Sequence, residues 1–117
     1  MPLRLLFGPF FILAGVMHFV IPRTYAAMVP PRLPARRAIV YASGVAEIAG
    51  GAAVVHPRTR RAGSLWSVAT LLAVFPANIH MALHPDRYRV PGGRVALYLR
   101  LPVQALFIAW AITAGRD

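Results

Sequence analysis

A single acidic side chain, Glu47, stands in the middle of a long apolar run, in the stretch YASGVAEIAGG at residues 41–51. It is the only Asp or Glu that precedes Asp86 in the chain. An ionised acid at the centre of a membrane helix costs about 3 kcal/mol on insertion scales, so such a carboxylate needs a partner or a proton. Glu47 is therefore a candidate proton acceptor, and the residue it meets decides its role.

Two polar residues of a later apolar run are the candidate partners. Arg100 and Gln104 are four residues apart and share one helix face. At 1.5 Å per residue from the same membrane face, Glu47 and Gln104 both lie about 13 Å deep and Arg100 about 7 Å deep. We therefore predict an Arg100–Glu47 contact that Gln104 completes. Such a pair is either part of a functional polar pocket or only fixes the register and assembly of the helices, and both interpretations stay open.

The other polar residues of the apolar runs fall in the same half of the bilayer. His18 and His80 lie near one membrane face and are candidate proton relays for Glu47, which makes these three the candidate catalytic residues. The candidate ligand-binding residues are Arg100, Gln104, Asn78, Tyr41 and Ser43. A polar group in an apolar slot is what a site for a quinone or another lipophilic molecule needs.

A metal site is a weaker alternative. His80 and His84 are four residues apart, and with Glu47 or His18 they could form a two-His, one-carboxylate set. A b-type haem between His18 and His80 is a further alternative. Histidines at a membrane interface are commonly just solvated, so we predict no metal.

Composition indicates how these residues are positioned. The chain has 117 residues, of which 58% are hydrophobic and 14% charged, too much apolar surface for so short a chain to bury in water. Four apolar stretches near the ~20 residues of a membrane helix predict a single all-α domain, an integral membrane antiparallel four-helix bundle, with spans at about residues 3–21, 38–55, 62–83 and 95–114. The first stretch has no Ala-x-Ala-type cleavage site, so we expect it to remain as a helix.

Small residues predict which way Glu47 faces. Ser43, Gly44, Gly50 and Gly51 surround it at helical spacing, and such a strip lets another helix approach closely.

Pro76 and Pro102 interrupt the third and fourth runs and would leave nearby carbonyls, those of Leu72 and Tyr98, without their usual amide donors. The segment PRTYAAMVPPRLPARR after the first run is expected to cap the polar half along the lipid head groups.

The net charge of +10 is carried by thirteen basic residues, all of them Arg. Most lie in short loops beside the predicted helix ends, where they meet lipid phosphates rather than nucleic acid.

The absence of Cys excludes thiol–disulfide exchange and cysteine-ligated iron–sulfur clusters within this sequence. We expect a multi-pass protein of the bacterial cytoplasmic membrane. The raw count of arginines favours the longer loops as cytoplasmic, whereas the density of arginine in HPRTRR, residues 56–61, favours both termini inside, which is the orientation we expect.

Several motifs in order resemble the DoxX-like family of small four-helix membrane proteins. They are His18-Phe19 followed by Pro22 and Tyr25, then VPPRLP, YASGVAEIAGG, HPRTRR and VFPANIHMAL. The family's Ser-Gly-x-x-Glu pattern matches Ser43, Gly44 and Glu47, and its Pro-Ala-Asn pattern matches Pro76, Ala77 and Asn78. The resemblance implies an antiparallel membrane bundle. Its members include a subunit of a thiosulfate:quinone oxidoreductase and proteins linked to oxidative-stress complexes or to membrane-protein assembly.

Two functions are therefore expected, and a third, a proton-coupled small-molecule transporter, would require an oligomer of this four-helix chain. In the first, the polar pocket binds a quinone or another lipophilic molecule, and the protein is part of a quinone-linked oxidoreductase together with a partner redox protein or a second copy of itself. In the second, it is a non-catalytic subunit or assembly factor of a partner membrane complex. The lipid bilayer is a partner in both cases.

Overall fold

The computed structural model describes residues 3–29, 33–88 and 92–116, and it contains helices and no strands within those ranges. The long helical segments are η1 with α1 (Leu3–Leu6 and Phe7–Val20), α3 (Arg36–Val55), α4 (Arg60–Leu83) and α5 (Gly93–Ala114). Two short helices, α2 (Pro22–Ala26) and η2 (Pro85–Arg87), follow α1 and α4. All four long segments are long and apolar enough to cross a membrane, as predicted. Their bounds differ from the predicted spans by at most two residues.

Prolines set several helix ends, because proline lacks an amide hydrogen and disfavours a helical residue before it. Pro22 opens α2 after the end of α1, and α3 ends just before the segment His56-Pro57. The turn between α3 and α4 is short, and side chains at its end donate hydrogen bonds to carbonyls in the last turn of α3, which have no helical partner. The Thr59 hydroxyl donates to the Ala53 carbonyl, and Arg60 Nε donates to the Val54 carbonyl at 3.1 Å.

Helices α1 and α3 pack through two pairs of facing glycines. A Cβ atom on Gly15 would lie 2.6 Å from the Gly44 carbonyl oxygen, and one on Gly51 would lie 2.6 Å from the Gly8 carbonyl oxygen. Only glycine allows two helix backbones to lie this close. As a result, side chains next to the two glycine pairs are brought into contact across the α1–α3 interface. The predicted strip of small residues on α3 is thus confirmed as a helix contact.

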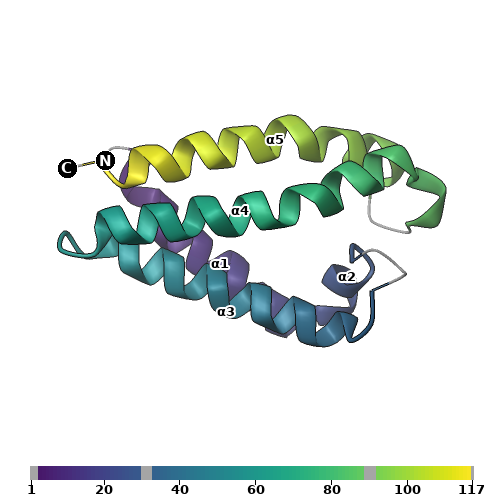
Figure 1. The fold of residues 1–117 in the computed structure, drawn as a ribbon, viewed down its shortest axis with the longest axis horizontal. Coiled ribbons are helices and arrows are strands. Elements are labelled where there is room, and N and C mark those ends of the chain that lie inside the picture. The colour runs from purple at the N-terminus through teal and green to yellow at the C-terminus, as the bar shows by residue number, and fades with distance from the viewer. Residues whose placement is uncertain (1–2, 30–32, 89–91, 117) are drawn as a thin grey trace.

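A second pair, α4 and α5, lies beside the first (Figure 1). The buried Ser64 hydroxyl of α4 donates to the Ala111 carbonyl of α5 at 2.7 Å. At the end of the bundle near Leu3 and Arg116, Trp110 Nε1 donates to the Leu3 carbonyl at 2.7 Å, which ties α5 to the first helical segment. The rings of Trp110 and Phe7 pack there in a T-shaped arrangement, with centroids 5.3 Å apart and planes 80° apart.

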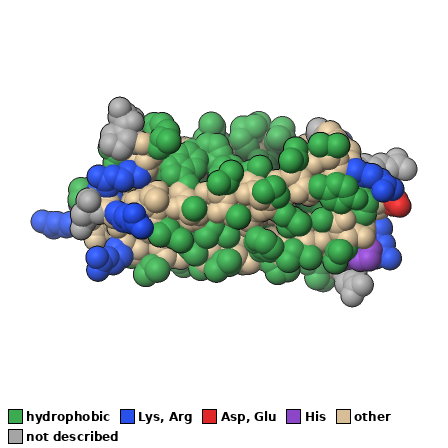
Figure 2. Space-filling view, turned by 90° about the horizontal axis from the view of Figure 1, so that it is seen from above, with side chains coloured by type: hydrophobic (Ala, Val, Ile, Leu, Met, Phe, Trp, Pro, Cys, Tyr) green, Lys and Arg blue, Asp and Glu red, His purple; other side chains and the backbone are tan. Residues whose placement is uncertain are grey.

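The apolar core falls into two clusters, one toward each end of the bundle. The larger cluster lies toward the end where Trp110 meets Leu3 and comprises Phe7, Phe11, Val54, Leu71, Ala111 and Ala114. The smaller one lies at the other end, hereafter the loop end, and comprises Met81, Tyr88 and Leu97 with Met28 packed against it. Outside, hydrophobic side chains cover the middle of the molecule, and arginines gather at both ends (Figure 2).

Gly15→Ala and Gly51→Ala are each expected to destabilise the protein by about 1–3 kcal/mol, the usual cost of overpacking, because the new methyl group meets backbone that cannot move aside. Unfolding in mild detergent, followed by the fluorescence of Trp66 and Trp110, measures the effect. Ala52→Leu, on an exposed position of α3, is the matched control and should leave stability unchanged. Glycine variants as stable as the parent would contradict the close α1–α3 contact.

Candidate functional site

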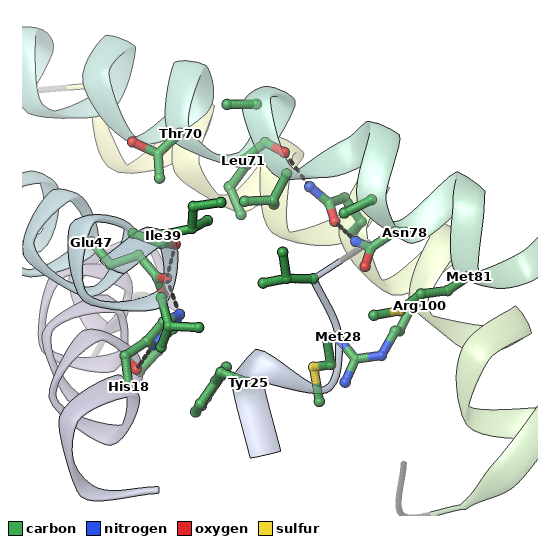
Figure 3. A pocket seen from close by; sticks show the side chains of 18 of the residues that line it. His18, Tyr25, Met28, Ile39, Glu47, Thr70, Leu71, Asn78, Met81 and Arg100 are labelled. Atoms are coloured by element: carbon green, nitrogen blue, oxygen red, sulfur yellow. Dashed lines mark hydrogen bonds and ion pairs between the residues drawn. The ribbon is translucent and has the colours of Figure 1, made fainter. Parts of the chain in front are cut away.

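A cavity of about 860 Å³ lies between the α1–α3 pair and the α4–α5 pair, with α2 beside it (Figure 3). Its volume falls within the range of about 300–1,000 Å³ that small-molecule sites occupy. Most of its wall is apolar, including Phe10, Phe11, Leu71, Val74 and Phe107. The polar side chains of the wall concentrate toward the loop end and come from all five α-helices, so the fold gathers polar groups that lie far apart in the sequence.

His18 of α1 and Glu47 of α3 form an acid–base pair on one wall of the cavity. His18 Nε2 lies 3.0 Å from Glu47 Oε2, and both side chains are almost buried, at 10% and 12% exposure. Ser43 Oγ, one turn before Glu47, donates to the same carboxylate oxygen at 3.3 Å. The pair exists because Gly15 and Gly44 bring the two backbones together: a Cβ on Gly44 would lie 2.8 Å from His18 Cβ.

The hydrogen bonds around His18 determine how many protons the pair holds. His18 Nδ1 lies 2.7 Å from the Ala14 carbonyl oxygen, which can only accept, so Nδ1 carries a hydrogen. The contact between Nε2 and the carboxylate then needs one more proton, which resides on either atom. In both forms, imidazolium with carboxylate or imidazole with carboxylic acid, the net charge of the pair is zero.

Tyr25 of α2 covers the imidazole of His18. Their rings stack with centroids 3.9 Å apart and planes 18° apart. Burial raises the pKa of the Tyr25 hydroxyl, the negative charge of Glu47 raises it further, and the positive charge of Arg100 opposes that rise. Tyr25 therefore stays a neutral hydrogen-bonding group at physiological pH. Sequence reasoning did not select it, although its place one turn after Pro22 at a helix end was a usable signal.

Arg100 of α5 enters the cavity from the opposite wall, with its guanidinium near Met28 (Figure 3). The predicted Arg100–Glu47 contact is wrong: Glu47 pairs with His18, and the buried Arg100 Nε has no hydrogen-bond partner. The predicted depths placed Arg100 about one helical turn from the level of Glu47, but the cavity separates α3 from α5. A buried N–H group without an acceptor costs about 1–3 kcal/mol.

Gln104 and Asn78 brace α5 against α4 rather than completing a contact with Glu47. Asn78 Nδ2 donates to Gln104 Oε1, and Gln104 Nε2 donates to the Leu71 carbonyl, one residue before the Leu72 carbonyl predicted to be freed by Pro76. Both amides are buried and line the cavity. The hydrogen bond between the two amides and the one to the Leu71 carbonyl hold the wall in place. Contact of either amide with a ligand remains a prediction.

The remaining predicted residues are divided between the cavity and other surfaces. His80 lines the cavity, its Nδ1 is hydrogen-bonded to the Tyr88 hydroxyl, and its ring lies against His84. Tyr41 is not part of the described cavity wall and stacks instead on Phe19 of α1. Within residues 3–29, 33–88 and 92–116, no three His, Cys, Asp or Glu side chains cluster so as to hold a metal ion.

Fold and site together define a small all-helical protein with a cavity between its two helix pairs and an almost buried acid–base pair on the cavity wall. The family model described as Domain of unknown function (DUF8561) matches residues 7–115, which is nearly the whole chain. The chain belongs to this family. Searches of curated proteins and of solved structures found no match.

A double-mutant cycle on His18→Leu and Glu47→Leu should give a coupling energy of about 0.5–3 kcal/mol, because each single change strands a buried polar partner and the double change removes both. Equilibrium unfolding in detergent measures the four proteins. The matched control is the Asp86–Arg94 pair, whose side chains are 83% and 61% exposed and whose coupling should be smaller. Additive effects of His18→Leu and Glu47→Leu would contradict a direct interaction.

Proposed function

We propose that the protein crosses the bacterial cytoplasmic membrane four times as an antiparallel helix bundle. Twenty helical residues span about 30 Å, the thickness of the hydrocarbon core, and α3 has 20 residues. The hydrophobic middle between two arginine-bearing ends supports this placement (Figure 2). The glycine contacts support the antiparallel arrangement, because the earlier glycine of α1, Gly8, faces the later glycine of α3, Gly51.

The function that the geometry supports best is binding of a lipophilic small molecule in the cavity, and a quinone is the class we propose first. One observation carries the proposal. The mostly apolar cavity has the His18–Glu47 pair on one wall and Arg100, whose Nε has no hydrogen-bond partner, on the opposite wall. Arg100 can donate to a ligand oxygen, and the Nε2–Oε2 hydrogen bond of His18 and Glu47 holds a proton that can be exchanged.

A bound quinone would supply two-electron chemistry coupled to uptake of two protons. Within the chain, Glu47 and His18 hold a proton at the cavity wall, and His80, nearer the loop end, extends the polar wall toward the membrane face. The described residues include no cysteine and no metal cluster, so we propose that electrons come from a partner redox protein, with this chain as the quinone-binding membrane component of the oxidoreductase.

A non-catalytic subunit or assembly factor is the second candidate. It is favoured because residues of the chain itself complete the hydrogen bonds of the acid–base pair. Ser43 hydrogen-bonds to Glu47 and the Ala14 carbonyl to His18, so the pair needs no ligand. In that case the pair joins α1 to α3, and the exposed apolar faces, for example at Leu13, Leu65 and Leu106, contact partner helices as well as lipid.

Glu47→Gln separates the two candidates. Glutamine can still hydrogen-bond to His18 but cannot accept a proton, so a functional pocket should lose ligand affinity by about tenfold or more while the protein remains folded. The protein is purified in mild detergent, organic extracts are analysed by mass spectrometry, and binding of a short-chain quinone is titrated alongside thermal unfolding. Asp86→Asn, at an exposed position of η2, is the control.

The outcomes point in opposite directions. A stoichiometric quinone or other lipophile in the parent protein, lost in Glu47→Gln, supports the binding function. An empty parent protein that binds no quinone, combined with loss of stability in Glu47→Gln, contradicts it and supports the structural role.

A further inference from the structure

The charges that line the cavity do not balance. Among the described residues of its wall, Glu47 is the one carboxylate and Arg100 the one arginine. Glu47 shares its proton with His18, and that pair is neutral in both of its forms. The positive charge of Arg100 therefore has no counterion on the described wall.

The immediate surroundings of Arg100 do not compensate for it. Its Nε is buried and has no hydrogen-bond partner, and the described chain offers no carboxylate at ion-pair distance. Of the polar groups that share the wall, the Asn78 and Gln104 amides are hydrogen-bonded to each other, and the Tyr25 hydroxyl is neutral. Arg100 as a whole is only partly buried, and the acceptor whose geometry matches a guanidinium is a bidentate anion with at least two oxygens.

The rest of the cavity is shaped for hydrocarbon. Phe107 lies seven residues beyond Arg100 on α5, about 10 Å farther from the loop end, and its ring meets Phe10 at a centroid distance of 5.4 Å. Phe11, Ala14 and Val74 line the space between the helix pairs. A polar head at Arg100 would thus be continued by an apolar tail toward the aromatic residues.

We infer that the occupant of the cavity is a single-chain amphiphile with an anionic head group, a carboxylate or a phosphate, which pairs with Arg100 while its alkyl chain lies toward Phe10 and Phe107. This inference rests on the proposed lipophile-binding function and names an anionic amphiphile, in place of the neutral quinone, as the ligand. It assigns Arg100 as the residue that selects for charge, and it leaves the neutral His18–Glu47 pair on the wall opposite the head group.

Matched probes test the charge. The full chain is placed in nanodiscs of zwitterionic phosphatidylcholine, and binding of laurate, methyl laurate, dodecyl phosphate and a short-chain quinone is measured. Laurate or dodecyl phosphate should bind at least about tenfold more tightly than methyl laurate, and whichever of the two binds better identifies the head group. Inorganic phosphate alone should bind far more weakly than dodecyl phosphate.

Variants of Arg100 assign the preference to this side chain. Arg100→Gln should abolish the preference for the acid over the ester, while Arg100→Lys, which keeps the charge, should retain part of it. Arg94→Gln, an exposed arginine on the same helix, should behave like the parent. Thermal unfolding of each variant in the same nanodiscs shows that the bundle remains folded.

Each failure has a different meaning. If methyl laurate or the quinone binds as tightly as laurate and dodecyl phosphate, or if a folded Arg100→Gln protein keeps the acid preference, the inference is wrong and the proposed function survives. The inference that the ligand is an amphiphile is also wrong if inorganic phosphate binds as tightly as dodecyl phosphate. If none of the four probes binds, both the inference and the proposed function are overturned.

Discussion

Glycine-to-glycine contact between α1 and α3 is the constraint on which the rest of the site depends. With no side chains at Gly15 and Gly44, the two backbones approach closely enough for His18 and Glu47 to form a direct hydrogen bond. Any larger residue at these positions would push the helices apart and leave two polar groups buried without partners, the situation that costs most in a low-dielectric interior. The acid–base pair is thus a consequence of backbone packing and stabilises that packing in turn.

The same close contact explains why a cavity exists. Because α1 packs tightly on α3 and α4 packs on α5, the bundle consists of two pairs, and the aromatic rings of Phe7, Phe10 and Trp110 join α1 to α5 toward one end. Toward the loop end the space between the pairs is not filled by helix packing, and the short helix α2 contributes Tyr25 to its wall. Tight packing within each pair and loose packing between the pairs together produce a polar-lined cavity.

Much of the fold could be predicted from the sequence, because apolar runs of about twenty residues bounded by proline and arginine allow few alternatives to long helices. The inward orientation of Glu47 was also predictable, from the small residues around it. Its partner was not, because depth along a helix fixes a residue's height but not the distance between two helices. Gly8 and Gly15, seven residues apart on the first helix, match the spacing of Gly44 and Gly51 and would have pointed to α1. The Asn78–Gln104 brace likewise depends on the packing of α4 on α5, which composition does not reveal.

The single proton between His18 and Glu47 has a consequence of its own. Its transfer from Nε2 to Oε2 converts a zwitterion into two neutral groups, so this wall of the cavity changes its dipole moment while its total charge stays constant. Such proton tautomerism requires neither solvent nor a moving helix, since Ala14 and Ser43 keep both side chains oriented throughout. The polarity opposite Arg100 can therefore adapt to different occupants without any change in the number of protons that the protein holds.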